Sequence, residues 1–250
     1  MAIMIKTLQE IEKMRRAGAA TRQVLQHLAT LVKPGVTTLD LDVEAERKTL
    51  ELGAVPAFKG YHGYPGSVCA SVNDEVVHGI PSAKKVLKEG DIVSLDFGLV
   101  IDGFYGDSAI TVPVGEKVAP ETLRLLEVTK ASLESGIRAV KVGGTLGDVG
   151  AAVQEVVESD GFSVVRDFVG HGIGTRMHED PQVPNYGRRG MGLKLREGMV
   201  IAIEPMVNAG KPGVQVLEDG WTAVTQDGSM SAHFEHTVAV TAKGAVVLTS

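Results

Sequence analysis

The stretch LKEGDIVSLD, residues 87–96, recurs as LREGMVIAIE at residues 195–204, and each copy ends in a carboxylate. The copies are 108 residues apart, and KPGVT at residues 33–37 recurs at that offset as KVGGT at residues 141–145. Two matches in one register indicate a single domain, residues 1–250, built from two related halves, roughly 1–118 and 119–250, about a pseudo-twofold axis. The two carboxylates should then meet at the seam between the halves. Buried acids are costly there unless something neutralises them, and a metal ion is the usual solution.

The composition is that of an ordinary globular protein. Hydrophobic residues make up 44% of the 250 residues and charged residues 22%, which is enough apolar material for a sizeable core. The net charge of −6 gives no basic footprint for nucleic acid. No apolar run approaches the roughly 20 residues that span a bilayer, so we expect no membrane association. Cys69 is the only cysteine, which excludes an internal disulfide and favours a reducing cytoplasm.

Each half is expected to open with two helices. Thr7 and Glu10 form a capping-box pattern before a helix that runs to about residue 32. Thr37 or the threonine after it should cap a second helix that ends near residue 52. In the second half, Pro120 should begin one helix, and residues 146–159 should form another.

Strands are expected to follow the helices in both halves. Residues 91–100 predict a buried strand, and residues 105–114 a return strand with Asp107 near its start. In the second half, residues 199–207 should pair with a return strand near residues 234–240, which Glu235 opens as Asp107 opens its own. Each half then supplies two carboxylates on neighbouring strands. The pattern predicts an α/β (α+β) fold, with antiparallel sheet covered by helices.

Four converging carboxylates would repel one another and become protonated unless cations were bound. Two divalent ions would balance four negative charges, and one imidazole would complete the site. The best candidate is His171 in VGHGIG, residues 169–174, because the flanking glycines let the ring approach another strand closely. Ligation dominated by oxygen suits Mn, Fe(II), Co or Mg. Taken alone, one aspartate in a strand or one histidine in a loop is more often structural, but matched acids in both halves favour a dinuclear site.

The motifs resemble those of the methionine aminopeptidases over essentially the whole chain. The resemblance is carried by GYHGYP at 60–65, VHGIP at 77–81, GHGIG at 170–174 and MHEDP at 177–181, and by two aspartates eleven residues apart. The resemblance implies the "pita-bread" fold and the metal ligands Asp96, Asp107, His171, Glu204 and Glu235. The last two ligands are only 31 positions apart, which leaves no room for the helical insertion of type II members. The chain also starts at the first helix without a Cys-rich extension, so it is similar to the minimal bacterial type I form.

By this resemblance, the reaction is hydrolysis of the peptide bond after an N-terminal methionine when the second residue is small and uncharged. The family implies two divalent ions, Co, Mn, Fe(II) or similar, that activate a water, and it allows an additional monovalent cation. Asp107 and Glu235 would bridge the ions, Asp96 would hold one flank, and His171 with Glu204 the other. The resemblance also implies roles for three catalytic residues. Glu204 would be a proton shuttle, His178 would contact the scissile amide, and His78 would contact the leaving-side nitrogen.

The family correspondence also implies an apolar methionine pocket and a set of partners. The pocket residues are Phe58, Tyr61, Tyr64, Cys69, Met177 and Trp221, beside His78 and His178. Position 177 is commonly aromatic in relatives and is methionine here, so the pocket rim should be softer. The expected partners are the N-termini of nascent polypeptides at the ribosome, acted on by a cytoplasmic monomer.

Two other readings share the fold. Prolidase-like enzymes have the same five ligands but usually carry a separate N-terminal domain. Binding proteins that kept the fold and lost catalysis should lack one or more ligands, whereas all five are present here together with both histidines. Metal content and turnover of a Met-Ala-Ser peptide would separate the three readings.

Overall fold

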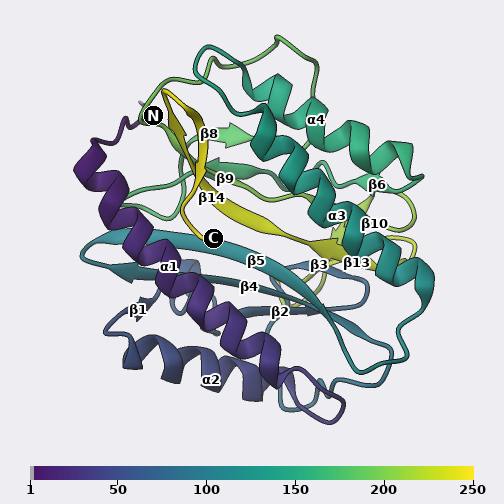
Figure 1. The fold of residues 1–250 in the computed structure, drawn as a ribbon. Helices are drawn as coiled ribbons and strands as arrows, with labels where there is room; N and C mark the ends of the chain where they lie inside the picture. Colours follow the sequence, from purple (N-terminus) through teal and green to yellow (C-terminus); the bar gives the residue numbers. More distant parts are fainter. Residues whose placement is uncertain (1–2) are drawn as a thin grey trace.

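The computed structural model describes residues 3–250 and shows helices packed on a curved antiparallel sheet (Figure 1). The helices are α1 (Leu8–Leu31), α2 (Thr38–Glu51), α3 (Pro120–Ala139) and α4 (Leu146–Ser159), with a 3₁₀ turn η1 (Tyr61–Gly63). The strands are β1 (Val55–Pro56), β2 (Cys69–Val72), β3 (Glu75–Val77), β4 (Ile92–Ile101), β5 (Phe104–Pro113), β6 (Ser163–Val164), β7 (Gly170–Gly172), β8 (Glu179–Val183), β9 (Val200–Ile203), β10 (Met206–Asn208), β11 (Val214–Val216), β12 (Ala223–Thr225), β13 (Ser231–His233), β14 (Glu235–Thr241) and β15 (Gly244–Val247).

Local sequence signals set where the four helices begin. Thr7, Thr37 and Thr145 each cap a helix with a complete capping box, and Pro120 occupies the first turn of α3. In a capping box a hydroxyl and a carboxylate satisfy amide groups that have no partner within the helix. All four expected helices are confirmed, with ends within about two residues of those predicted.

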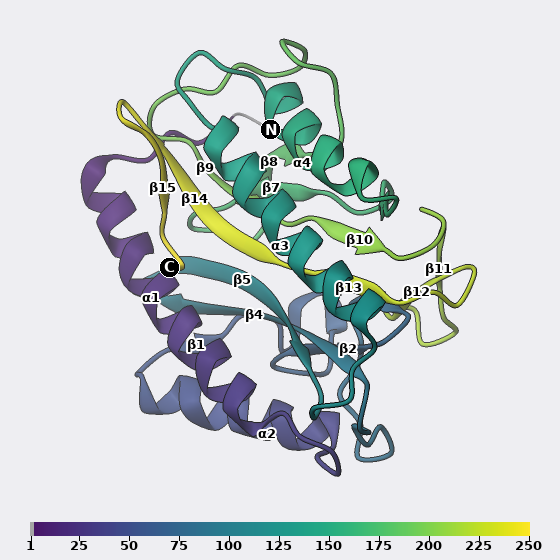
Figure 2. The ribbon, with the colours of Figure 1, turned by 45° about the vertical axis from the view of Figure 1, so that its right-hand side comes forward.

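The central sheet joins the two halves. Its strand order is β1-β4-β5-β14-β9-β7-β8, with β2 also paired to β4 and β15 to β14. The hairpin β4–β5 belongs to the first half and the antiparallel pair of β9 and β14 to the second, so β5 and β14 meet in the middle. Figure 2 shows α1 and α3 crossing the same face of the sheet, in front of these two strands. The expected architecture of helix-covered antiparallel sheet is therefore confirmed.

Backbone contacts repeat at the offset found in the sequence. Thr37 bridges Val86 in the first half, and Thr145 bridges Lys194 in the second. Glycines with positive φ repeat likewise, as Gly35 and Gly143, Gly53 and Gly161, and Gly90 and Gly198. Left-handed backbone at matched positions marks the same turns in both halves. The two halves are thus structural copies up to the first long strand of each.

The return strands are related by a different offset from the one expected. The Thr111 hydroxyl donates to the carbonyl of His233 and accepts from its amide, and the Thr237 hydroxyl makes the same two bonds with Asp107. These reciprocal bonds relate Thr111 to Thr237 and Asp107 to His233. The expectation that Glu235 matches Asp107 is therefore wrong by two residues.

The hairpin registers give the physical reason. In the first half Asp96 lies opposite Ala109, and Asp107 lies opposite Gly98. In the second half His236 pairs with Ile203, which places Glu235 opposite Glu204. The second pair of acids is directly cross-strand, whereas the first pair is diagonal.

The expected strand at residues 199–207 is also broken in two. Val200–Ile203 pairs with β14, but Met206–Asn208 leaves that sheet and pairs with β13 and β6. Pro205 lies at the break, where its missing N–H cannot donate to a ladder. Glu204 is the last residue before the break, at the point where the two sheets part.

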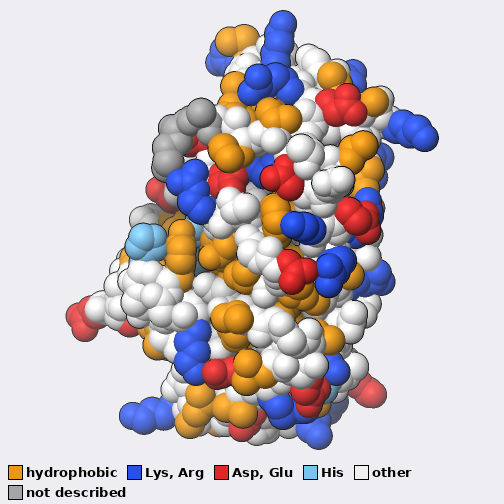
Figure 3. Space-filling view, turned by 90° about the vertical axis from the view of Figure 1, so that its left-hand side faces the viewer, with side chains coloured by type: hydrophobic (Ala, Val, Ile, Leu, Met, Phe, Trp, Pro, Cys, Tyr) orange, Lys and Arg blue, Asp and Glu red, His pale blue; other side chains and the backbone are white. Residues whose placement is uncertain are grey.

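The surface carries mixed charge. On the face in Figure 3, acidic and basic side chains are interspersed with apolar ones. Within residues 3–250, no helix is long and apolar enough to cross a membrane.

Candidate metal centre

The five expected ligands come from strands that are neighbours in the central sheet. Asp96 lies on β4, Asp107 on β5, Glu235 at the start of β14, Glu204 directly after β9, and His171 in the middle of β7. Adjacent strands in a sheet are about 5 Å apart, so side chains that point to one face of these five strands converge. The structure brings together all five residues.

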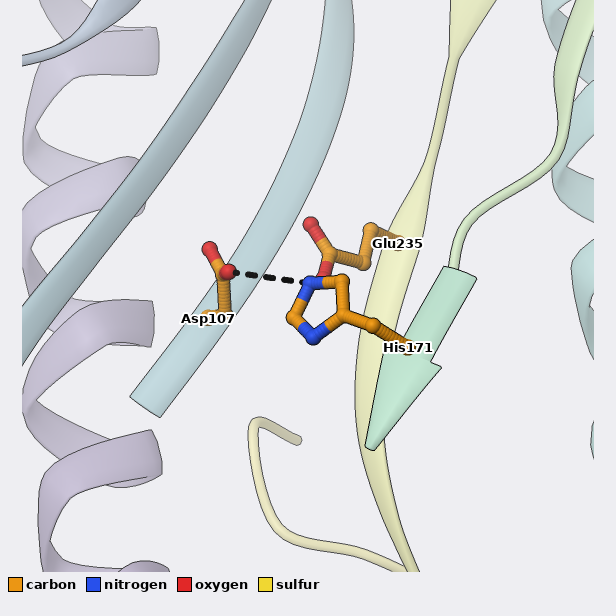
Figure 4. Close-up of side chains that lie close together, drawn as sticks. All are labelled: Asp107, His171 and Glu235. Atoms are coloured by element: carbon orange, nitrogen blue, oxygen red, sulfur yellow. Dashed lines mark ion pairs between the residues drawn. The ribbon is translucent and has the colours of Figure 1, made fainter. Parts of the chain in front are cut away.

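Three of the five form a compact triad of ligand atoms. One atom each of Asp107, His171 and Glu235 lies within 4.8 Å of the other two. Figure 4 shows the three side chains pointing toward one another from β5, β7 and β14. The Nε2 atom of His171 is 3.7 Å from Asp107 Oδ2 and 3.6 Å from Glu204 Oε1. Asp96 and Glu204 line the same cavity.

His171 presents a free nitrogen to this cluster. Its Nδ1 lies 2.9 Å from the carbonyl oxygen of Gly172, which can only accept, so Nδ1 carries the proton. The Nε2 lone pair then faces the carboxylates. A Cβ on Gly170 would lie 2.3 Å from the Ala202 carbonyl oxygen, and one on Gly172 would lie 2.2 Å from that of Asp180. The glycines flanking His171 are therefore required for the close approach of β7, as predicted.

Burial makes the carboxylates hard to ionise together. Desolvation raises the pKa of Asp96, Glu204 and Glu235 well above the usual range, and the neighbouring carboxylates raise these pKa values further. Burial also raises the pKa of Asp107 to about 7. Like charges that share a buried site cannot all ionise unless a positive charge joins them.

Divalent cations fit this donor set. The Oδ1 atom of Asp107 and the Oε1 atom of Glu235 are buried with no hydrogen-bond partner within residues 3–250. Buried acceptors are normally paired, so two such atoms that face one cluster indicate a cation as the partner. The donors are carboxylate oxygens and one imidazole nitrogen, a set that suits Mn, Fe(II) or Co.

The histidine expected to contact the scissile amide lies beside the triad. The rings of His178 and His171 have centroids 4.3 Å apart, and the Tyr61 hydroxyl is 2.8 Å from His178 Nδ1. Partial burial lowers the pKa of His178 first, and the nearby His62 lowers it further. His178 is therefore neutral at pH 7.

His78 lines the same cavity. It has φ = 60°, and its ring stands edge-on to Phe168 at 5.5 Å and to Trp221 at 6.3 Å. Burial lowers the pKa of His78 to about 4. A left-handed backbone is unusual for a residue other than glycine and is typical of functional sites.

An apolar pocket opens onto the acidic cluster. The cavity has a volume of about 530 Å³. All six expected pocket residues line it, namely Phe58, Tyr61, Tyr64, Cys69, Met177 and Trp221. The Tyr64 hydroxyl donates to the Gly79 carbonyl, which holds its ring in place, and the backbone amide of Trp221 donates to Asp219, which fixes the backbone at that position. Burial raises the pKa of the Cys69 thiol, so this cysteine is not a thiolate nucleophile.

Sequence reasoning missed two histidines of this region. His62 lines the cavity with φ = 48°, next to Tyr61, which was expected there. His233 is buried, and its Nε2 lies 3.8 Å from Glu204 Oε2. The sequence could have pointed to His233 only through the correct offset between the return strands, which matches it to Asp107. A search that matches acids with acids does not reveal that offset.

Comparison with known proteins gives the same picture over the whole chain. Residues 12–242 match the sequence model of metallopeptidase family M24. A methionine aminopeptidase from Clostridium acetobutylicum is 51% identical over 247 residues, which cover 99% of this chain and 98% of the relative. Methionine aminopeptidase 1 from Bacillus subtilis is 50% identical and is covered to 99%.

Solved structures agree. A methionine aminopeptidase from Thermotoga maritima superposes with a TM-score of 0.97 at 52% identity, and the match covers both chains completely. A prolidase from Pyrococcus furiosus has a TM-score of 0.79 at 24% identity, and the match spans 65% of that chain. The second likeness shows the shared pita-bread fold alone.

Proposed function

Because the chain belongs to metallopeptidase family M24, and to the bacterial type I methionine aminopeptidases within it, we propose that it removes N-terminal methionine from polypeptides whose second residue is small and uncharged. The observation that carries this proposal is the direct opening of an apolar pocket onto a cluster of four acids, two of them buried and two half-buried, and one imidazole. The substrates proposed are the N-termini of newly made polypeptides. Two divalent cations, when bound, would polarise the scissile carbonyl and supply a nucleophilic water at neutral pH.

Strand order supports a division of labour among the ligands. Asp107 and Glu235 lie on the two central strands, so we assign them to both cations. Asp96 lies on the first-half side of that pair and would hold one cation. His171 and Glu204 lie on the second-half side and would hold the other.

Glu204 is the group assigned to move the proton. Its Oε1 faces His171, its carboxylate lines the cavity, and burial makes protonation easy. It would take a proton from the attacking water and pass it to the leaving nitrogen. Because Glu204 would be both a metal ligand and the proton carrier, its loss would lower turnover and metal occupancy together.

His178 and His78 would act on the substrate backbone. Since His178 is neutral, it can donate one hydrogen bond toward the carbonyl oxygen as negative charge develops there. Tyr61 sets the ring of His178 through its hydroxyl. His78, in the same cavity, would meet the nitrogen on the leaving side.

The shape of the pocket supports the proposed choice of methionine. An unbranched thioether can thread between Tyr61, Tyr64 and Trp221, where aromatic rings and sulfur make favourable contacts. Met177 adds a flexible wall, and its Cε lies near Gly98, where a Cβ would be 3.3 Å from it. The two substrate histidines would crowd the second side chain and exclude large or charged ones.

A matched peptide series tests the proposal. Met-Ala-Ser should be cleaved, whereas Met-Arg-Ser and N-acetyl-Met-Ala-Ser should not, since the first crowds the histidines and the second lacks the free amine. Chelation should abolish cleavage, and Mn, Co or Fe(II) should restore it. Equal cleavage of Met-Ala-Ser and Met-Arg-Ser would contradict the crowding argument, and full turnover without metal would contradict the dinuclear mechanism.

A further inference from the structure

His233, at the end of β13, is buried but lacks partners for its ring. The side chain is 2% exposed, and neither Nδ1 nor Nε2 has a hydrogen-bond partner among the described residues. The backbone is fully engaged, since the amide donates to Thr111 and the carbonyl accepts from the same hydroxyl. A buried polar ring without partners is costly. The ring is therefore expected to have a partner in the working protein.

The nearest charged group to the ring is the Glu204 carboxylate. His233 Nε2 is 3.8 Å from Glu204 Oε2, while Glu204 Oε1 is 3.6 Å from His171 Nε2. The carboxylate thus lies between two imidazoles, one on each oxygen. A distance of 3.8 Å exceeds the roughly 2.7–3.2 Å of an N–H···O bond, so a small rotation of the Glu204 side chain would close it.

The pseudo-twofold axis shows why the ring is placed there. His233 occupies, in the second half, the backbone cradle that holds Asp107 in the first, with Thr111 and Thr237 exchanging roles. A carboxylate in that cradle would add a fifth negative charge beside Glu204. A neutral imidazole instead offers one N–H donor and no charge.

We propose that His233 is a positioning residue for Glu204. Its Nε2–H donates to Glu204 Oε2, which leaves Oε1 turned toward His171 and the cavity. His233 does not line the cavity, so its effect on substrate passes through Glu204. The inference rests on the proposed role of Glu204 as metal ligand and proton carrier.

Two variants test whether the hydrogen-bond donor of His233 is required or only the space that its ring fills. His233→Gln places an amide N–H near the position of Nε2, whereas His233→Leu fills the space without a donor. Mn²⁺ titration calorimetry would give stoichiometry and affinity, and kcat and KM would be measured on Met-Ala-Ser. Loss of an outer hydrogen-bond partner typically lowers metal affinity or activity about 10–100-fold. In His233→Leu we expect that loss of affinity at one of the two Mn²⁺ equivalents, together with a fall in kcat and little change in KM. In His233→Gln we expect most of the Mn²⁺ affinity and most of the kcat to be recovered.

The protein loaded with diamagnetic Mg²⁺, in which Glu204 is ionised, gives an independent readout. In ¹⁵N-detected spectra of the imidazole, the proton should reside on Nε2 of His233. A proton on Nδ1, wild-type Mn²⁺ affinity in a folded His233→Leu, or equal losses in both variants would overturn the proposal. Loss of a whole Mn²⁺ equivalent in His233→Gln would also overturn it, because His233 would then be a ligand itself. If wild type binds no Mn²⁺, the proposed function fails; if wild type binds and both variants match it, only the positioning role fails.

Discussion

The two halves share a scaffold but contribute different chemistry. The axis relates Asp96 to Glu204 and Asp107 to His233, so the matched positions of the two halves carry a carboxylate or an imidazole. The strand flanking β4 in the first half, β2, contributes Cys69 to the apolar pocket, whereas the strand flanking β9 in the second half, β7, contributes His171 to the acidic cluster. The two halves therefore differ most in the flanking strands, where β2 contributes to the apolar pocket and β7 to the acidic cluster. The strands beside the axis, β5 and β14, carry acidic residues in both halves.

The largest expected effect concerns the acids on the two central strands, Asp107 and Glu235, which should contribute equally to metal binding if the two halves share the site. Asp107→Asn and Glu235→Gln each remove one charge, keep the side-chain shape and sit on opposite sides of the axis. We expect each to weaken metal binding by more than the roughly 10–100-fold typical of outer partners, and to reduce peptide turnover to background. Titration calorimetry and Met-Ala-Ser cleavage measure both effects. A large loss in one variant with wild-type behaviour in the other would show that only one half holds the cations.

Much of the fold and the cluster was predictable because their signals are local or repeated. Capping boxes set helix starts within the sequence itself, and the repeated phrase located Asp96 and Glu204. The break at Pro205 and the two-residue shift of the return strand were not predictable, because they depend on which strands pair. Matching acid with acid led to Glu235 as the counterpart of Asp107, where the sheet register gives His233.

The next prediction concerns a residue of the N-terminal segment that serves the second half. Lys6 Nζ is 2.6 Å from Glu179 Oε2, and both side chains are almost fully buried. The other oxygen of Glu179 accepts from the amides of Thr175 and Arg176, in the turn that leads to His178. Lys6→Met leaves an unpaired buried charge, which typically costs about 3–5 kcal/mol. Urea unfolding of the variant would measure this loss.

A double variant provides the control for that ion pair. Glu179→Gln keeps an acceptor for both amides and removes the charge, so Lys6→Met with Glu179→Gln should recover much of the stability lost in Lys6→Met alone. If Lys6→Met unfolds at the wild-type urea midpoint, the N-terminal segment does not support the second half in the way inferred.

Removing a substrate histidine tests the chemistry without removing a ligand. His178→Ala should retain its metal content and lose about 10²–10³-fold in kcat, the typical effect of one lost donor to a developing oxyanion. Tyr61→Phe removes only the hydroxyl bonded to His178 and should cost less. Metal analysis and steady-state kinetics check both. A fall in metal occupancy in His178→Ala would mean that this ring belongs to the metal cluster.

Acid sensitivity should also differ between the halves. Burial lowers the pKa of His78 to about 4 in the first half, and lowers those of His171, His233 and His236 to about 3, 3 and 4 in the second. Below the ordinary histidine pKa near 6.5 the unfolded chain binds more protons than the folded one, so each group costs stability as pH falls from about 7 toward 4.

His78→Gln isolates the first-half contribution. The pKa difference of His78 corresponds to about 2–3 kcal/mol at pH 4.5. The variant should therefore lose that much less free energy of unfolding than wild type between pH 7 and pH 4.5. Urea titrations at both pH values measure it, and parallel losses in the two proteins would show that the pKa of His78 is the same in the folded and unfolded states.

The smallest expected difference lies in the helix caps, where the two halves are most alike. Thr37 and Thr145 cap α2 and α4 with the same box, and their hydroxyls accept from the backbone amides of Asp40 and Asp148 at 3.1 and 3.2 Å. Substitution of either threonine by alanine should cost about 1 kcal/mol.

Thr145→Ala should nonetheless be the costlier of the two cap substitutions. Thr145 is 5% exposed, and its partner Asp148 also accepts from the amide of Gly190, so water has less access to the groups that lose the hydroxyl. Thr37 remains partly exposed, and water can replace its hydroxyl there. Unfolding midpoints of the two alanine variants, with Thr→Ser at each position as the control that keeps the hydroxyl, measure the difference. An equal cost at both caps would show that the helix ends remain equivalent even where their surroundings have diverged.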